Sequence, residues 1–470
     1  MTVDDPDLVT WLRQRGAGRG DLVGLAVAPD GTAAVAAAAG RNGRMTSLGE
    51  VALADDEIRP RWVTWSQETA QRLLAGGVRV ATCWDVAAVH RLVFGGWRAD
   101  PGWAWAHLHG LAPDGVPAGA PEAEPPDLFS EPDEVWADAG DDPVGADGYL
   151  RADWVRGGWA AAPARILCWA RLARQTAELQ RAALGRMSET PMPGATARSE
   201  STAELLCAEL SADGLPMDLA AAERVLAGII GPRPRDEAHA AAMRAARDAE
   251  VLRHAPDGVT ADLRSPVQVR SLLAAAGVDV PDTRAWRLEQ FRESSPLIAA
   301  LLEWRKAERI ATTYGYAWLD EHLDSDGRLR GSWTGSDGAA GRMTASSGLH
   351  NMPAAMRQAV IAAPGHALIR ADLGQIEPRV LAAVAGDPAL AAATAADDLY
   401  LPVASQLGVD RPTAKVAMIA AMYGQTTGHG AQALRRLNAA YPVAMAYLDS
   451  ADRAGRAGRD LRTYSGRLIV

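Results

Sequence analysis

The stretch ALIRADLGQIEPRVLAAVAG, residues 367–386, decides the fold that we expect for the C-terminal half of the chain. A short apolar run, 367–369, leads to Asp372 within one strand length, and a glycine turn follows. Apolar residues then recur at helical spacing, and Pro378 suits a first helical turn, where its missing N–H costs nothing. The pattern predicts a buried strand with Asp372 at its C-terminal tip, and a helix with Glu377 at its mouth.

A carboxylate at a strand tip that faces a helix N-terminus is suited to hold Mg²⁺ against phosphates. A helix cap or a surface acid would produce the same spacing. The string 372–379, Asp-Leu-Gly-Gln-Ile-Glu-Pro-Arg, resembles the signature Asp-Tyr-Ser-Gln-Ile-Glu-Leu-Arg of family A (polymerase I-like) DNA polymerases, of the bacterial exonuclease/polymerase type. The resemblance implies that Asp372 is a catalytic, metal-binding residue, and that Gln375 and Glu377 bind the incoming nucleotide. The chain departs from that signature at Leu373, Gly374 and Pro378.

Composition bounds the class of protein. A length of 470 residues predicts two to four domains with sizeable cores. The hydrophobic fraction is 48%, no run of about 18 apolar residues occurs, and the N-terminus is polar. We therefore expect neither a membrane span nor a signal peptide. Three widely spaced cysteines fit no metal-ligand pattern and cannot all pair, which indicates a reduced, cytoplasmic protein.

The net charge of −10 is unevenly distributed. Residues 301–470 carry a balance of +2 and residues 1–300 a balance of −12, so the acidity does not exclude DNA binding by the C-terminal part. The chain holds only two lysines, Lys306 and Lys415, among many arginines. Because arginine does not deprotonate in proteins, a retained lysine is consistent with ammonium chemistry that guanidinium cannot perform.

The first 111 residues alternate predicted strands and helices in an order compatible with a ribonuclease H-like domain, the architecture of the polymerase I proofreading exonuclease. The expected strands are 22–28, 32–38, 61–65 and 78–83, and the expected helices are 67–74 and 86–93. Two-metal hydrolysis needs several converging acids, but the first strand has apolar 25–27 where an Asp-x-Glu pair belongs. Asp85 and Asp153 could equally be helix caps. We expect no exonuclease activity.

Two linkers are expected before the C-terminal region. Residues 112–148 are rich in Pro, Gly, Asp and Glu, helix returns over 152–184, and 187–199 reads as a second linker. The predicted division is a ribonuclease H-like domain at 1–111, an acidic linker and connecting helix at 112–199, and a C-terminally incomplete polymerase domain at 200–470.

The resemblance extends over about 200–470 and implies a mostly α, α+β polymerase domain with thumb, fingers and part of a palm. Residues 301–306 and 312–314 are similar to the long thumb helix of the family, which implies that Arg305, Lys306 and Arg309 contact DNA phosphates. A solvated helix face is the alternative. The segments 341–346 and 349–353 are similar to the family's Thr-Gly-Arg and Asn-Leu-Gln-Asn-Ile-Pro run, which implies that Arg342 and Asn351 touch the minor groove.

The stretch 410–424 predicts a helix with Asp410 as its N-cap, proline in its first turn and glycine at its end. Arg411 and Lys415 are four residues apart, so they share one face near the helix N-terminus, where anions are favoured. An exposed basic face would be the ordinary explanation. The longer pattern Arg-x-x-x-Lys-x-x-x-Ile-x-x-x-Tyr-Gly resembles the nucleotide-binding finger helix of family A polymerases.

That likeness implies that Arg411 and Lys415 hold the triphosphate, with Lys415 also placed to protonate the leaving pyrophosphate. Tyr423 would lie beside the templating base pair, and Ile419 would stand where the family has an aromatic residue on the nucleotide sugar. Upstream, residues 398–400 read Asp-Leu-Tyr in place of Asp-Ile-His, so a phosphate-contacting histidine is absent.

The family's later His-Asp-Glu motif, which supplies the second metal-binding acid, does not occur in the sequence. The final residues, 462–470, are similar to the segment that precedes it, so we expect a polymerase-like chain truncated before its last catalytic motif and weak in activity. The expected reaction is template-directed addition of deoxynucleotides to a primer 3′-OH with two Mg²⁺ ions. A non-catalytic DNA- or nucleotide-binding remnant is the alternative, and a standalone nuclease is a third. The expected partners are primer-template DNA and deoxynucleoside triphosphates, for a monomer in the nucleoid-containing cytoplasm.

Overall fold

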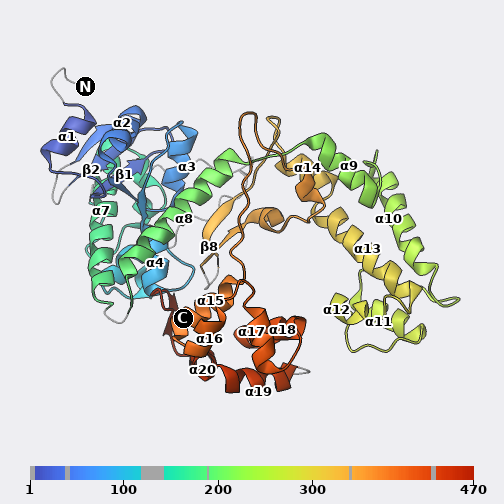
Figure 1. Ribbon diagram of the computed structural model, residues 1–470. Coiled ribbons are helices and arrows are strands. Elements are labelled where there is room, and N and C mark those ends of the chain that lie inside the picture. The colour runs from blue at the N-terminus through green and yellow to red at the C-terminus, as the bar shows by residue number, and fades with distance from the viewer. Residues whose placement is uncertain (1–5, 38–42, 118–141, 188–189, 338–340, 425–429) are drawn as a thin grey trace. The chain divides into compact units, whose positions relative to one another are not determined.

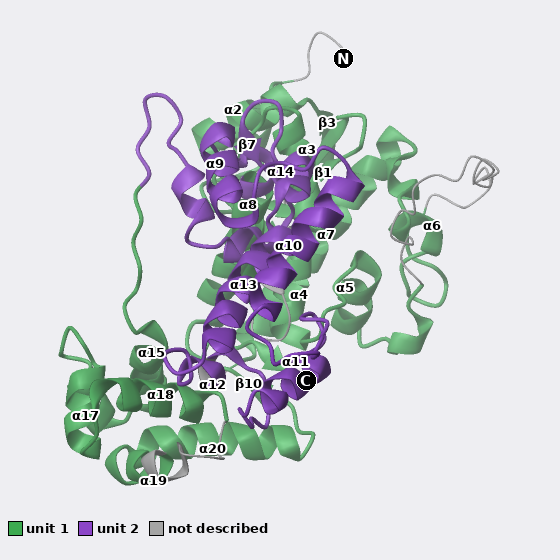
Figure 2. Ribbon diagram, turned by 90° about the vertical axis from the view of Figure 1, so that its right-hand side faces the viewer, with its two compact units in different colours: residues 1–209, 334–344, 369–470 green, residues 210–333, 345–368 purple. Residues whose placement is uncertain are grey.

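The computed structural model describes residues 6–37, 43–117, 142–187, 190–337, 341–424 and 430–470. The chain forms two compact units, which Figure 2 colours separately. Unit 1 comprises Met1–Glu209, Thr334–Thr344 and Ile369–Val470, and unit 2 comprises Leu210–Trp333 and Ala345–Leu368. Each unit encloses its own clusters of buried apolar side chains.

Unit 1 begins with a five-stranded mixed sheet in the order β3-β2-β1-β4-β5. The strands are β1 (Leu22–Val27), β2 (Ala33–Ala36), β3 (Gly43–Thr46), β4 (Arg61–Thr64) and β5 (Cys83–Asp85). The pairs β1–β2 and β2–β3 are antiparallel, and the pairs β1–β4 and β4–β5 are parallel. The predicted hairpin and the predicted strand at 61–65 are confirmed.

The sheet is a middle layer because both of its faces are apolar. Alternate residues such as Ala26 and Ala34 face a cluster that includes Trp169 of α7 (Pro163–Gly185), while Leu25 and Val35 face a second cluster with α1 and α2. At Gly24 a Cβ atom would lie 2.0 Å from the carbonyl oxygen of Ala170, so only glycine lets α7 approach the sheet this closely.

Further helices belong to this part of the chain, and Figure 1 shows α1, α2, α3 and α4 close to the sheet. They are α1 (Leu8–Gln14), α2 (Leu48–Ile58), α3 (Gln67–Ala75), α4 (Val86–Phe94), α5 (Pro101–Leu108) and α6 (Ala152–Val155), with α8 (Pro193–Asp213) leading toward unit 2. Short 3₁₀ turns occur at Pro113–Gly115 and Gly158–Ala160. None of the helices in the described residues is long and apolar enough to cross a membrane.

Two predictions for this part are wrong in their boundaries. The strand expected at 78–83 begins only at Cys83, since Val78 and Val80 are buried without ladder pairing. The second linker, expected at 187–199, already contains the first turns of α8, which begins at Pro193, a residue suited to a first helical turn.

Unit 2 is largely helical. Its helices are α9 (Leu219–Ile230), α10 (Glu237–Leu252), α11 (Pro266–Ala275), α12 (Ala285–Glu289), α13 (Pro296–Thr313) and α14 (Tyr316–His322), with 3₁₀ turns at Ser346–Asn351 and Met356–Ala359. The short strands β6 (Leu215–Pro216) and β7 (Arg328–Leu329) pair in it. Strands β8 (Trp333–Asp337) and β9 (Arg342–Ala345) form a two-stranded sheet where the chain passes between the units.

The C-terminal part of unit 1 is a group of helices around one apolar cluster, drawn in orange and red in Figure 1. The helices are α15 (Ile376–Ala385), α16 (Pro388–Ala393), α17 (Tyr400–Leu407), α18 (Arg411–Met422), α19 (Gly430–Ala440) and α20 (Pro442–Arg456), followed by strands β10 (Leu461–Arg462) and β11 (Leu468–Ile469). Asp387 fastens two of them. Its carboxylate accepts N–H donors at the start of α16 and of α20, at 2.9–3.1 Å.

The strand predicted before α15 is not formed. Residues 366–373 are irregular and exposed, with Ile369 93% and Leu373 73% accessible. A strand needs a neighbour for its N–H and C=O groups, and none of the described strands pairs with this segment. The prediction that Asp372 stands at the tip of a buried strand is therefore wrong, whereas the helix that follows is confirmed.

Candidate functional site

The candidate site begins at the turn into α15. Gln375 is the N-cap residue of this helix and adopts a left-handed backbone conformation with φ of 55°. Such a conformation is uncommon for a residue with a side chain and needs support from its surroundings. Glu377 follows in the first turn, where the positive end of the helix dipole favours a carboxylate. The turn therefore places the carboxylate of Glu377 two residues after the amide of Gln375.

Helix α18 contributes the cations. Asp410 accepts the backbone N–H of Thr413 at 2.8 Å, which confirms it as the N-cap, and the side chain and then the backbone N–H of Thr413 lower the pKa of its carboxyl group. Arg411 and Lys415 follow in the first turns, and both are exposed. Arg411 forms an ion pair with Asp398, while Lys415 makes no hydrogen bond or ion pair within the described residues. An uncompensated lysine near a helix N-terminus favours an anionic ligand.

Three residues that were predicted to have different roles, Arg342, Glu377 and Tyr423, contact one another at the start of α15 and the end of α18. The Tyr423 hydroxyl donates to Glu377 Oε1 at 3.0 Å, and Arg342 Nη2 donates to the Tyr423 hydroxyl at 3.1 Å and to Glu377 at 3.3 Å. The hydrogen bond to Tyr423, with the nearby Glu377 charge, raises the pKa of Arg342. Ile419 lies one turn before Tyr423 and is half-buried.

A pocket of about 340 Å³ adjoins this trio. It is lined by Ile376, Glu377, Val380, Leu381, Val384, Met422 and Tyr423. Its walls are therefore mostly apolar, with one carboxylate and one phenol as polar groups, the composition usual for sites that bind an organic ring.

Two residues of this region carry interactions that the sequence analysis did not assign. Asp398 accepts hydrogen bonds from Gln375 and forms the ion pair with Arg411, which lowers the pKa of its carboxyl group. Arg379 donates to the carbonyl groups of Thr394, Ala396 and Asp397. The signal for Asp398 was its place in the Asp-Leu-Tyr string, and that for Arg379 was its match to the signature. Neither sequence pattern indicates which residues Asp398 and Arg379 contact.

Asp372 stands apart from these contacts. It is exposed and makes no hydrogen bond or ion pair within the described residues. Among those residues no three His, Cys, Asp or Glu side chains come together as a metal site. A site for two Mg²⁺ ions needs several protein oxygen ligands in addition to the oxygen atoms of the substrate. The described residues do not fit a two-ion centre, and Asp372 is a single possible ligand.

The residues predicted to contact DNA in unit 2 differ in how they are engaged. On α13, Arg305 donates to the carbonyl oxygen of Thr283, and burial lowers the pKa of its guanidinium. Lys306 pairs with Glu303 at 3.0 Å, and Arg309 is exposed without an ion pair within the described residues. Asn351 is exposed and lies 2.8 Å from the ring of His350.

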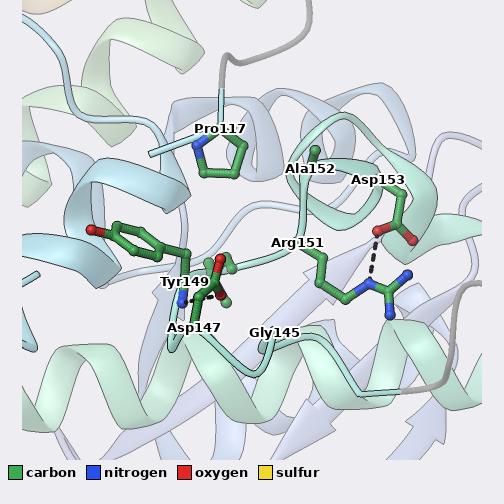
Figure 3. Close-up of a pocket in the computed structure, with 8 residues that line it drawn as sticks. Pro117, Gly145, Asp147, Tyr149, Arg151, Ala152 and Asp153 are labelled. Carbon is green, nitrogen blue, oxygen red and sulfur yellow. Dashed lines mark hydrogen bonds and ion pairs between the residues drawn. The ribbon is translucent and has the colours of Figure 1, made fainter. Parts of the chain in front are cut away.

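The two acids considered for a nuclease site are engaged elsewhere. Asp85 is the N-cap of α4, accepting the backbone N–H of Ala88 at 2.8 Å, as the cap alternative requires. Asp153 lines a pocket of about 350 Å³ and pairs with Arg151 at 3.2 Å, as Figure 3 shows, and with Arg165 at 3.3 Å. Both carboxylates are buried and satisfied by the protein itself.

Comparisons with known proteins agree on one family. The family model described as DNA polymerase family A matches residues 237–450. DNA polymerase I of Chloroflexus aurantiacus is 30% identical over 211 residues, which cover 39% of this chain and 22% of that protein. The thermostable DNA polymerase I of Thermus aquaticus is 34% identical over 112 residues, covering 22% of this chain and 14% of that protein.

A solved structure shares the fold. The POL domain of Pol1 from M. smegmatis, in complex with DNA primer-template and dNTP, superposes with a TM-score of 0.62 at 19% sequence identity. The superposition covers 99% of this chain and 81% of that one. The curated relatives, by contrast, are matched over less than a quarter of their length.

Proposed function

We propose that the chain binds primer-template DNA and a deoxynucleoside triphosphate in the manner of a template-directed DNA polymerase. The premise is that residues 237–450 match the model of DNA polymerase family A. The proposed reaction class is deoxynucleotidyl transfer to a primer 3′-OH. The superposed M. smegmatis domain holds both ligands, which supports the choice of partners. DNA binding would associate the protein with the nucleoid, and a monomer suffices for it.

One observation carries the nucleotide half of the proposal. Arg411 and Lys415 lie one turn apart at the N-terminus of α18, where unpaired backbone N–H groups and the helix dipole add to their charge. Their guanidinium and ammonium groups would bind the phosphates. Glu377 and Tyr423, with Gln375 and Ile419 nearby along α15 and α18, would surround the sugar and base.

The DNA half rests on residues that keep free donors. Arg342 and Asn351 are proposed to reach the minor groove, and Arg305, Lys306 and Arg309 the phosphate backbone. Arg309 supports this best, since its guanidinium is exposed and unpaired within the described residues. Arg305 supports it least, since Thr283 already accepts one of its N–H groups.

Nucleotide binding is tested with Lys415→Ala. Charge-assisted hydrogen bonds contribute about 1.5–3 kcal/mol each, so the variant is expected to bind dATP roughly ten- to a hundredfold more weakly. The matched control is Arg435→Ala, which removes an exposed cation of α19 that has no ion pair within the described residues. Affinities from equilibrium titration at two salt concentrations give the comparison. Equal losses in both variants would reduce the effect to net charge.

A non-catalytic DNA- or nucleotide-binding protein is the second candidate. It is favoured because, within the described residues, Asp372 belongs to no group of three or more His, Cys, Asp or Glu side chains, and a metal-assisted transfer needs more than one acid. Mg²⁺ dependence is general among family A polymerases, and Asp372 is the residue of this chain proposed to take part in it. Primer extension with a labelled primer separates the candidates: templated extension lost in Asp372→Ala supports the enzyme, and binding without extension supports the alternative.

For the N-terminal part we propose a ribonuclease H-like domain at 1–111 without nuclease activity, a linker and connecting helix at 112–199, and the polymerase region at 200–470. The support is the order of the sheet, with three antiparallel strands followed by two parallel ones, each parallel strand reached through helix. The buried, apolar first strand supports the absence of the first pair of nuclease acids.

A further inference from the structure

Asp398 joins the two elements that carry most of the candidate site. Its Oδ1 accepts the side-chain N–H of Gln375 at 2.9 Å and the backbone N–H of Tyr400 at 3.0 Å, and its Oδ2 accepts Nε–H of Arg411. The Gln375 amide is itself held, since its Oε1 accepts the backbone N–H of Leu399 at 2.6 Å. One carboxylate therefore connects the turn before α15 to the first residue of α18.

The loop that carries Asp398 is fastened independently. Arg379, from the second turn of α15, donates to the carbonyl oxygens of Thr394, Ala396 and Asp397 at 2.6–2.9 Å. These bonds fix the backbone that leads into Asp398. The position of its carboxylate is thus determined by α15 and its loop, and not by Arg411 alone.

This arrangement has a consequence for Arg411. An exposed arginine samples many rotamers, and fixing it on a ligand costs side-chain entropy. The bond from Nε to Asp398 meets this cost before any ligand arrives. It leaves the two terminal amino groups, which make no hydrogen bond within the described residues and can form a fork toward phosphate oxygens. The guanidinium carbon also lies 5.8 Å from the ring of Tyr400.

We propose that Asp398 is a positioning residue that presents Arg411 to the phosphates of the nucleotide, and that Gln375 sets its geometry from the turn before α15. The inference rests on the proposed binding of a triphosphate at α18. It gives Gln375 a part in phosphate binding through Asp398, in addition to the nucleotide contact that the family resemblance implies.

Simple electrostatics predicts the opposite sign. A carboxylate close to the triphosphate repels it and neutralises Arg411, so its removal should tighten binding if charge alone mattered. Positioning predicts that the same removal weakens binding although the site becomes more positive. The direction of one change therefore separates the two roles.

The principal variant is Asp398→Asn, which keeps the shape and the hydrogen bonds from Gln375 and Tyr400 but loses the ion pair with Arg411. Its control is Asp397→Asn, an identical change of charge one residue away. Equilibrium titration with dATP is expected to show binding weakened about three- to tenfold by Asp398→Asn, the range for loss of one coupled contact. Asp397→Asn should leave the affinity unchanged or slightly higher.

Three further measurements separate positioning from a general loss of folding. Asp398→Glu retains the charge but displaces the carboxylate, so positioning predicts weaker binding here as well. Asp398→Asn placed in an Arg411→Lys background should add little, because lysine has no Nε–H to be held and no fork to present. Inorganic tripolyphosphate should show the same losses as dATP, and deoxyadenosine should show none.

The outcomes are distinct. Tighter binding of dATP by Asp398→Asn, or additive losses with Arg411→Lys, would overturn the positioning role. Wild-type binding that Lys415→Ala weakens and Asp398→Asn does not would overturn the inference and leave the proposed function standing. No binding of dATP or tripolyphosphate by the wild-type chain would overturn both.

Discussion

Two aspartates of unit 1, Asp85 and Asp398, each stand just before a helix, and the structure treats them differently. Asp85 is 2% exposed and lies close to Glu204, itself 3% exposed, whose carboxylate is bonded to Arg91 and to the backbone N–H of Gly335. Burial, and then the Glu204 charge, raise the pKa of Asp85 to about 7. Asp398 remains partly exposed, and Arg411 lowers its pKa.

The difference shows what separates a structural charge from a ligand-binding one. The carboxylates of Asp85 and Glu204 are buried and accept hydrogen bonds from the protein. A ligand would therefore have to displace internal hydrogen bonds in a medium of low dielectric constant. The Asp398–Arg411 pair is partly exposed, lies one helical turn from Lys415, which has no ion pair within the described residues, and leaves the terminal amino groups of Arg411 as donors. Acids at the end of a strand are therefore a weaker indication of chemistry than a cation that the fold leaves without a partner.

The largest expected effect is at a buried acid of the C-terminal helices. Asp387 is 1% exposed, and four backbone N–H donors lower its pKa although burial opposes this. Asp387→Ala removes the caps of α16 and α20 together. At about 1 kcal/mol for each cap and a further penalty for the buried N–H groups, the expected loss of stability is roughly 3 kcal/mol.

The melting transitions of the wild type and of Asp387→Ala are compared, and Asp449→Ala, a change at an exposed residue of α20, is the control. Since the folded-state pKa of Asp387 is lowered, its contribution is present above the unfolded value of 3.8 and is lost as the pH falls through the folded value. A variant that melts like the wild type would show that Asp387 is not a shared cap.

A smaller effect of opposite sign is expected at Asp85. Its folded-state pKa of about 7 exceeds the unfolded value, so the protein loses stability as the pH rises from about 4 to 7 and the carboxyl group ionises. Asp85→Asn keeps the oxygen that caps α4 but cannot ionise. We expect it to stabilise the protein at pH 8 by roughly 1 kcal/mol, since relaxation around the pair reduces the full cost of its charge.

Melting temperatures of wild type and Asp85→Asn at pH 5 and pH 8 test this. The two proteins should converge at pH 5 and separate at pH 8. A variant that is less stable at pH 8 would mean that Asp85 works as a paired anion, and the contrast with Asp398 would then be one of degree.

The last expectation is that the chain does not remove nucleotides from a DNA 3′ end. With Asp85 committed to α4 and Asp153 to two arginines, we expect a single-stranded oligonucleotide with a labelled 3′ end to stay intact with Mg²⁺ or Mn²⁺. The readout is product length on a denaturing gel, beside a known 3′–5′ exonuclease as positive control. Shortening that disappears in Asp85→Ala would show that the buried acid is still a catalytic group.

Local features of the fold were predictable. The hairpin in the first sheet and the helix after Asp372 follow from periodicity, and the helix capped by Asp410 follows also from the bond between Asp410 and Thr413, three positions apart. The strand expected at 367–372 does not form, because an apolar run becomes a strand only when another strand offers its backbone groups. Of the candidate site, the residue types at α15 and α18 were predictable from the sequence, and their partners were not.

The start of α18 follows from the sequence alone, since the Asp410 cap and the N–H of Thr413 lie within one turn and need no other part of the chain. The sequence also placed Arg411 and Lys415 on one face, because helical geometry fixes that. The contact of Asp398 with Arg411, 13 residues away, and that of Arg342 with Tyr423, 81 residues away, arise only when the chain is folded. Such contacts depend on the closure of the intervening loops and on which charged side chains are desolvated on folding. No local sequence pattern specifies either of these.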